Sequence, residues 1–409
     1  MEAVRIERIA AGGDGVGRLP DGRVVFVPRT APGDAVTLQE LRPSRRFVRA
    51  RLDQVLEPGP ERIAPTCPHY TSDSCGGCQL QHLTTRAQLA ARRGFVGDAL
   101  RRLARLDLPD PEIEPAAQEF GYRTKLTLAA TSGPRRIGLH PLGRAQDVFE
   151  LVRCHIAADS LMDLWAALRE MRRLLPPGLE KMVLRLDRSG GRHLVAHVRG
   201  TVVWTRAAEL AVELERRNVP ATLWWHPEGG APRVVAGPRG TAGPPVSVFE
   251  QVHPAMGDRV RRFAMSRLGS IVGQCVWDLY AGIGETTALL VEAGATVESV
   301  ERDSRAVAHA DSVGPSAVRH VGAAETMVHR LHPPDLVVTN PPRTGMDPVV
   351  TATIAAGSAR RIVYVSCDPA TLARDIVALG PRFALAETRA FDMFPQTAHV
   401  ETVAVLDRV

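Results

Sequence analysis

The 409-residue sequence predicts a multidomain α+β protein, with a small OB-type β-barrel, a central α+β region and a C-terminal doubly wound, Rossmann-like α/β domain. Three observations predict this order. Short apolar runs alternate with glycine turns at the N-terminus, a cysteine cluster follows, and strand-like runs then alternate with helix-like segments up to the C-terminus. We therefore expect domains over residues 1–57, 58–245 and 246–409.

The N-terminal region reads as a set of short strands with tight turns. Glycine-rich turns separate the strand candidates and favour a small barrel, an architecture that often binds nucleic acid. The candidates are Val4–Ile9, Arg23–Val27, Ala35–Leu41 and Phe47–Leu52. The run from Gly12 to Gly17 is not a phosphate loop, because no Lys-Ser/Thr pair follows it and no helix starts there.

The charge balance indicates a basic surface. The chain has 51 Lys plus Arg against 45 Asp plus Glu, and only Lys125 and Lys181 are lysines. An excess of arginine can follow from a GC-rich genome, so local clustering is the better sign of a surface for polyanions. Such a cluster comprises Arg42, Arg45, Arg46, Arg49 and Arg51. No run of 18 apolar residues and no signal-peptide pattern is present, so we expect a cytoplasmic protein without membrane contact.

Three cysteines stand within 12 residues, in the pattern Cys67-x7-Cys75-Gly-Gly-Cys78. The glycines allow the backbone to turn so that the flanking sulfurs face one point. A cytosolic chain does not usually form disulfides, so metal ligation is the favoured interpretation, with Cys154 as the fourth ligand. The spacing leaves zinc and an iron–sulfur cluster equally open.

The C-terminal domain contains a predicted cofactor site. A strand-like run, Cys275–Leu279, leads into a turn with Gly282 and Gly284, and the next strand ends at Glu301. Glycines there let the backbone approach a ligand, and an acid at this distance suits a ribose. The third glycine of a dinucleotide fingerprint is missing, so S-adenosylmethionine fits better than NAD. A further strand ends at Asn340, where a polar group would meet the cofactor or a substrate base.

Cys367 stands two residues after the apolar run Arg361–Val365 and precedes a helix-like segment. A thiol at the carboxyl end of a strand lies where open α/β sheets bind ligands, so it is a candidate nucleophile. Glu401, further along the chain, supplies a carboxylate.

Together these segments resemble the class I RNA 5-methyluridine methyltransferases, which include iron–sulfur 23S rRNA uridine methyltransferases and the tRNA uridine-54 enzyme. The resemblance covers almost the whole chain and is most specific in Ser366–Leu372 and Phe394–Glu401. It implies that residues 1–57 are a TRAM domain that binds RNA and that residues 58–245 are an RNA-binding domain that carries an iron–sulfur cluster. It also implies Cys367 as the nucleophile and Glu401 as the proton acceptor.

The same resemblance implies the ligands of the cofactors. S-adenosylmethionine would be bound at Gln251, Tyr280, Gly282, Gly284, Glu301 and Asn340. The cysteines Cys67, Cys75, Cys78 and Cys154 match those that hold a 4Fe–4S cluster in the family. The implied partner is RNA, with 23S rRNA favoured over tRNA, and the implied state is a monomer.

The sequence departs from the family pattern at several positions. Asn340 replaces an aspartate, Ala281 a cysteine, Thr124 an asparagine, and Ala323 falls where an acid is usual. The departures at Asn340 and Ala323 keep open a catalytically degenerate RNA-binding protein. Two further alternatives are a tRNA uridine-54 methyltransferase and a methyltransferase of small molecules or proteins.

Overall fold

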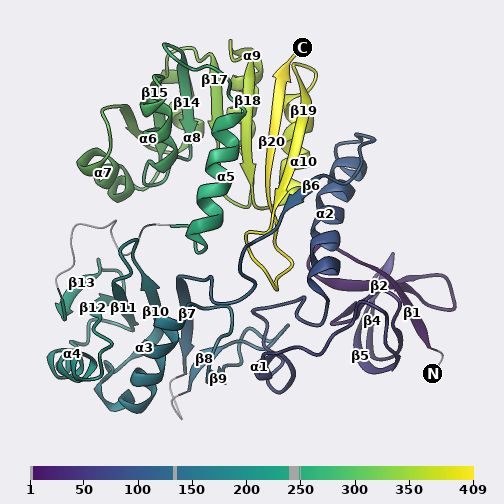
Figure 1. Cartoon of the computed structure of the whole chain (residues 1–409), viewed down its shortest axis with the longest axis vertical. Coiled ribbons are helices and arrows are strands. Elements are labelled where there is room, and N and C mark those ends of the chain that lie inside the picture. The colour runs from purple at the N-terminus through teal and green to yellow at the C-terminus, as the bar shows by residue number, and fades with distance from the viewer. Residues whose placement is uncertain (1–2, 132–135, 239–247, 249) are drawn as a thin grey trace.

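The computed structural model describes residues 3–131, 136–238, 248 and 250–409. Its strands form one closed barrel and two open sheets, which follow one another along the chain (Figure 1). None of the described helices combines the length and the apolar character needed to cross a lipid bilayer.

The N-terminal strands form the closed barrel in the order β1-β2-β3-β5-β4. Their apolar side chains alternate inward and build a small core of valines with Ile6 and Leu38. The strands are β1 (Val4–Ile9), β2 (Asp14–Arg18), β3 (Val24–Pro28), β4 (Ala35–Pro43) and β5 (Phe47–Glu57). The barrel predicted from the sequence is confirmed, but four of the six residues from Gly12 to Gly17 belong to β2 instead of to a turn.

The central region begins with two helices and continues as a seven-stranded sheet in the order β13-β12-β11-β10-β7-β8-β9. Helices α3 and α4 cover one face of this sheet, where Trp165, Leu184 and Leu194 are fully buried. The helices are α1 (Pro68–Thr71), α2 (Thr85–Arg102), α3 (Asp159–Glu170) and α4 (Ala207–Arg216). The strands are β7 (Lys125–Ala130), β8 (Ile137–Leu139), β9 (Phe149–Glu150), β10 (Leu179–Leu186), β11 (Arg192–Val198), β12 (Thr222–Pro227) and β13 (Arg233–Ala236).

The C-terminal sheet is doubly wound, as predicted, in the order β16-β15-β14-β17-β18-β20-β19-β6. Its strands are β14 (Cys275–Leu279), β15 (Thr296–Glu301), β16 (Val318–Val321), β17 (Leu336–Thr339), β18 (Arg361–Ser366), β19 (Phe383–Phe391) and β20 (Glu401–Arg408). Its helices are α5 (Pro254–Ser266), α6 (Glu285–Glu292), α7 (Ser304–Val313), α8 (Ala324–Met327), α9 (Pro348–Ala356) and α10 (Pro369–Leu379). One apolar layer contains α5 and α6, and the layer on the other face contains α9 and α10.

Two elements of the central region complete this last sheet. Strand β6 (Glu112–Glu114) pairs in parallel with β19, and α2 places Val96 and Leu100 in the layer of α9 and α10 (Figure 1). Residues before position 246 therefore form part of the C-terminal fold.

Candidate active site

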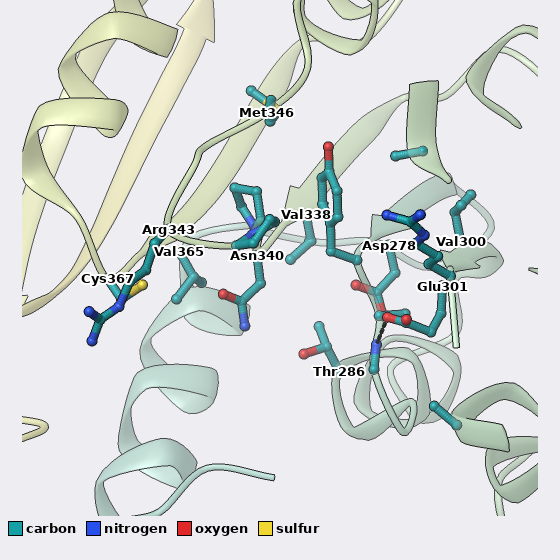
Figure 2. A pocket seen from close by; sticks show the side chains of 18 of the residues that line it. Asp278, Thr286, Val300, Glu301, Val338, Asn340, Arg343, Met346, Val365 and Cys367 are labelled. Carbon is teal, nitrogen blue, oxygen red and sulfur yellow. Dashed lines mark hydrogen bonds between the residues drawn. The ribbon is translucent and has the colours of Figure 1, made fainter. Parts of the chain in front are cut away.

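The parallel strands β14, β15, β17 and β18 end at a cavity of about 940 Å³. Most of the side chains predicted from the sequence to bind the cofactor or react line this cavity. They are Gln251, Tyr280, Gly282, Glu301, Asn340, Cys367 and Glu401. Figure 2 shows Cys367 and Arg343 at one end, Glu301 and Asp278 at the other, and Asn340 between them.

Gly284 is the exception, because it does not line the cavity. It precedes helix α6 with φ of 80°, and a Cβ there would lie 3.0 Å from the side chain of Ala310. A non-glycine residue would be strained in this left-handed conformation and would press on α7. Gly284 thus shapes the turn at the cavity without touching a ligand placed in it.

At the cofactor end, Glu301 fixes the glycine turn. Its Oε2 accepts a hydrogen bond from the backbone N–H of Gly282 at 2.9 Å, and its Oε1 accepts one from Asp303 at 2.7 Å. Tyr280 has φ of 62°, a left-handed conformation that costs a non-glycine residue about 1–2 kcal/mol. These hydrogen bonds hold the turn in a strained backbone conformation, which is common in loops that bind ligands.

Asp278 is a cavity residue that the sequence did not single out. It is buried at the end of β14, and its Oδ2 accepts a hydrogen bond from Thr287 Oγ1 at 2.6 Å. Burial raises the pKa of this carboxyl to about 7. Its place just before the glycine turn was the available signal, but nothing in the sequence shows that it is buried.

At the opposite end, strand pairing brings Cys367 and Glu401 together. Strands β18 and β20 are antiparallel and pair Ser366 with Thr402, so the next position along sets Cys367 opposite Glu401. Directly opposed residues of an antiparallel pair have Cβ atoms about 4.5–5.5 Å apart. Two residues that lie far apart in the sequence therefore face the same part of the cavity.

Burial controls the protonation of this pair. It raises the pKa of Glu401, which is 2 % exposed, to about 7. Burial also raises the pKa of the Cys367 thiol, and the charge on Glu401 raises it further. The guanidinium of Arg343 opposes both shifts, because a nearby cation favours the charged form of each group.

Arg343 itself has a neutral neighbour. Its Nη2 lies 3.4 Å from Nε2 of His399, and burial followed by the charge of Arg343 lowers the pKa of His399 to about 4. A neutral imidazole can accept a hydrogen bond from the guanidinium. Arg343 follows the Asn-Pro-Pro segment directly, but its role beside Cys367 depends on tertiary contacts that the sequence does not reveal.

The turn that carries Cys367 is strongly fixed. Asp368 caps helix α10 by accepting hydrogen bonds from the N–H groups of Ala370 at 2.9 Å and Thr371 at 3.1 Å. The first residue of this helix is Pro369, whose φ suits that position. The thiol thus sits at the N-terminal end of an 11-residue helix, whose dipole favours a thiolate.

The four remaining predicted ligands, Cys67, Cys75, Cys78 and Cys154, line a second cavity of about 420 Å³. Burial, together with the neighbouring thiols, raises the pKa of Cys75 to about 11 and that of Cys78 to about 12. However, the described residues contain no group of three or more His, Cys, Asp or Glu side chains arranged to hold a metal ion. The structure therefore places the four predicted ligands around one cavity but does not show the predicted metal centre.

The fold and the first cavity define a class I S-adenosylmethionine-dependent methyltransferase that carries an N-terminal barrel. Comparison with known proteins narrows this class. The TRAM domain family matches residues 2–52, and the tRNA (uracil-5-)-methyltransferase family matches residues 328–409. With relatives at 30 % identity or more over nearly its full length, the chain belongs to the family of S-adenosylmethionine-dependent RNA uracil-C5 methyltransferases.

Three of these similarities are informative. An uncharacterized RNA methyltransferase of Thermosynechococcus vestitus is 32 % identical, over 98 % of this chain and 97 % of its own length. The 23S rRNA (uracil(1939)-C(5))-methyltransferase RlmD of Pseudomonas putida is 33 % identical, over 98 % of this chain and 92 % of its own. The crystal structure of Pyrococcus abyssi tRNA (uracil-54, C5)-methyltransferase with S-adenosyl-L-homocysteine superposes with a TM-score of 0.73 at 20 % identity, covering 98 % and 99 % of the two chains.

Proposed function

We propose that this chain methylates C5 of a uridine in RNA, with Cys367 as the nucleophile and Glu401 as the proton acceptor. The observation that supports this most is the pairing of β18 with β20, which sets the two residues opposite each other at one wall of the cavity. The opposite end of that cavity, at Gly282 and Glu301, suits the nucleoside part of the methyl donor.

The mechanism follows from the chemistry of these two groups. The Cys367 thiolate adds to C6 of the uracil, and the electron pair of the C5–C6 double bond moves towards O4. S-adenosylmethionine, when bound, supplies an electrophilic methyl group to C5. Glu401 then takes the C5 proton, the C5–C6 double bond forms again, and the C6–sulfur bond breaks to release the thiolate.

The protonation of the pair suits this sequence of steps. A charged Glu401 raises the pKa of Cys367, so the thiol ionises more easily while Glu401 is protonated. Once the sulfur is bonded to C6 this repulsion is gone, and Glu401 must release its proton to solvent before it takes the proton from C5. Arg343 lowers the pKa of Cys367 and is positioned to stabilise the thiolate. Since the pKa of Glu401 is about 7, this carboxylate can accept a proton near neutral pH without holding it strongly.

For S-adenosylmethionine we propose Gln251, Tyr280, Gly282, Glu301 and Asn340 as the contacts. All five line the cavity, and the turn that carries Gly282 is held by Glu301. Gly284 keeps only a structural role in this proposal. Asn340 offers an amide where the family pattern has a carboxylate, so it can hydrogen-bond but adds no negative charge near the methyl donor.

We propose 23S rRNA as the substrate and a monomer in the cytoplasm as the working state. Relatives named as 23S rRNA enzymes support the first point, since they match nearly the whole chain, including the barrel. A single chain builds the whole cavity, which supports the second. The alternative, tRNA uridine-54, has the support of the Pyrococcus abyssi fold.

One measurement tests the reaction and the substrate together. Nucleoside mass spectrometry compares rRNA and tRNA from cells with and without this protein. We expect 5-methyluridine to be lost from 23S rRNA on deletion and restored by the wild-type gene but not by Cys367→Ala. Loss from tRNA alone would establish the alternative substrate, whereas no loss in either pool would favour a catalytically degenerate RNA-binding protein.

We also propose that Cys67, Cys75, Cys78 and Cys154 bind a 4Fe–4S cluster after a local rearrangement. Four reduced thiols line one cavity, and thiolates are the usual ligands of such a cluster. The side chains would have to move to bind all of its iron atoms. The test is iron and acid-labile sulfide per chain after anaerobic purification. Equal amounts of both, lost in Cys78→Ser, would support the cluster; bound zinc or no metal would refute it.

A further inference from the structure

The loop between β19 and β20 carries the chain into the active site. Phe391, the last residue of β19, pairs with Glu401, the first residue of β20. We call residues 392–400, which join these two strands, the hairpin loop. Phe394 of this loop lines both cavities, and His399 lines the second. The position of Glu401 therefore depends on how the hairpin loop is held.

Arg92 of helix α2 binds both arms of the hairpin loop. Its side chain is fully buried, and its Nη1 lies 3.2 Å from Oδ1 of Asp392, where the loop leaves β19. On the returning arm, its Nε donates a hydrogen bond to the carbonyl of Thr397 at 3.1 Å. Its Nη2 donates another to the carbonyl of Phe394 at 3.4 Å. One guanidinium thus connects three points of the loop.

Gln88, one helical turn before Arg92, extends these contacts from the same face of α2. Its Oε1 accepts hydrogen bonds from the backbone N–H of Gln396 and from Nη2 of Arg92, both at 3.1 Å. Its Nε2 donates to Oε1 of Gln396 at 2.9 Å. Gln396 has φ of 70°, a left-handed conformation that residues other than glycine rarely adopt. The buried amide of Gln88 therefore fixes an uncommon turn of the loop.

The hairpin loop is also held from a second direction. The carbonyl of Gln396 accepts hydrogen bonds from the backbone N–H groups of Gln79 at 3.1 Å and Leu80 at 3.0 Å, directly after Cys78. The hydroxyl of Tyr122 donates to the carbonyl of Pro395 at 3.0 Å. Segments from the first third of the chain thus surround a loop that lies near its end.

The ion pair between Arg92 and Asp392 is costly as a packing device. A buried charge costs free energy unless it is paired and hydrogen-bonded, and apolar side chains of similar size often stabilise a fold as well or better. Burial raises the pKa of Asp392, and the guanidinium of Arg92 opposes this shift. A need for one fixed loop geometry explains the pair better than stability does.

We propose that Arg92 and Gln88 are positioning residues for Glu401, because they hold the hairpin loop so that this carboxylate faces C5 of the uracil bonded to Cys367. This inference rests on the proposed function, since it concerns the proton removal assigned there to Glu401. Arg92 and Gln88 line neither cavity, so they act through the loop and do not touch the substrate.

The test separates formation of the covalent adduct from its breakdown. Arg92→Lys keeps a cation near Asp392 but cannot bond to both loop carbonyls. Gln88→Met removes the bonds to Gln396 and leaves no buried charge unpaired, so it tests the same loop if Arg92→Lys does not fold. We expect each change to lower kcat by about 10²-fold, a loss that a misplacement of about 1 Å can cause.

The step that slows should be removal of the C5 proton. A protein–RNA adduct should therefore accumulate on denaturing gels with a labelled, uridine-containing RNA oligonucleotide, although Cys367 and Glu401 are both intact. The rate of adduct formation in a single turnover and the affinity for S-adenosylmethionine by calorimetry should stay as in wild type. A merely structural role would instead lower formation and breakdown together, and that result would overturn the inference.

Arg361→Lys is the matched control. Arg361 pairs with Asp407 at the opposite end of β18 and β20, where its Nε lies 2.6 Å from Oδ1 of the carboxylate. This variant loses a comparable arginine–aspartate contact, and we expect wild-type turnover and no accumulated adduct. The same accumulation in Arg361→Lys would overturn the inference, because it would show a general effect of loosening these strands.

The outcomes distinguish this inference from the proposed function. If the wild type methylates RNA and Glu401→Gln traps an adduct, but Gln88→Met turns over normally, only the positioning role is wrong. If the wild type transfers no methyl group and Glu401→Gln forms no adduct, the proposed function itself is refuted.

Discussion

The chain places cysteines at two neighbouring cavities, and their surroundings differ. Cys367 faces Glu401 and Arg343, two groups whose charges act on the thiol in opposite directions. The second cavity surrounds Cys75 and Cys78 with further thiols, and burial dominates their pKa values. Arg29 lowers the pKa of Cys75 only in part, because burial and the further thiols outweigh it. The comparison teaches that a buried thiol becomes a candidate nucleophile when one cation acts on it alone, whereas a group of buried thiols needs a bound cation to ionise.

The largest effect is expected for the thiol with charged neighbours. Cys367→Ala removes the covalent step, and we expect methyl transfer to fall by about 10⁴-fold or more. Cys275→Ala is the matched control, because Cys275 lies at the start of β14, outside both cavities, and should stay active. Binding of S-adenosylmethionine by calorimetry should be equal in both variants. If Cys367→Ala still transferred methyl groups, Cys367 would not be the nucleophile, and it would not differ in role from the cysteines of the second cavity.

Glu401→Gln should separate formation of the covalent adduct from its breakdown. The amide cannot take the C5 proton, so turnover should fall by about 10²- to 10⁴-fold while a protein–RNA adduct accumulates. Denaturing gel electrophoresis with labelled RNA detects the adduct. The double variant Cys367→Ala/Glu401→Gln should form none, and an adduct in that variant would point to another nucleophile.

The burial of Glu401 should also make the free energy of unfolding depend on pH. Burial raises the pKa of Glu401 from 4.5 to about 7, so the folded chain binds more protons than the unfolded chain between these values. Its contribution to stability is therefore present below pH 4.5 and is lost as the pH rises towards 7. At pH 8, Glu401→Gln should unfold with a free energy up to about 3 kcal/mol higher than wild type, and at pH 4 with nearly the same. Denaturant unfolding at the two pH values measures this, and equal differences at both would show that burial does not set the Glu401 pKa.

The smallest catalytic effect is expected in the second cavity. Cys78 does not line the first cavity, so we expect Cys78→Ser to lower methyl transfer at saturating RNA less than tenfold, which is about 1.4 kcal/mol or less. Cys275→Ser serves as the control for loss of a thiol. A loss in Cys78→Ser as deep as that of Cys367→Ala would show that the two cavities act as one unit.

Much of the site was predictable because motifs lie at the carboxyl ends of strands. Seven of the eight residues predicted for cofactor binding and catalysis line one cavity, and Gly284 is the exception. Asp278 and Arg343 were missed, since their importance comes from burial and from neighbours that only the fold supplies. The cysteine pattern predicted proximity correctly but not ligand geometry, because spacing along a chain does not fix where sulfur atoms point.

The fold was predictable where the pattern was local. The barrel and the alternation of strands and helices follow from short-range periodicity, whereas the glycine run gave no sign that it contains β2. Strand β6 was missed because three residues carry no clear period, and its partner β19 lies in a distant part of the sequence. The domain limits at residues 57 and 245 stay predictions.

The pairing of β6 with β19 has a consequence for how this gene can be divided. A fragment that starts at residue 246 would leave the edge of β19 unpaired and would lack the cover that Val96 and Leu100 of α2 provide. An exposed strand edge beside bare apolar surface promotes aggregation. During synthesis on the ribosome, β6 emerges long before its partner strand β19. It can pair only after almost the whole chain has been made. The C-terminal domain therefore cannot be transferred alone to another protein. Any recombination or truncation has to keep it together with α2 and β6.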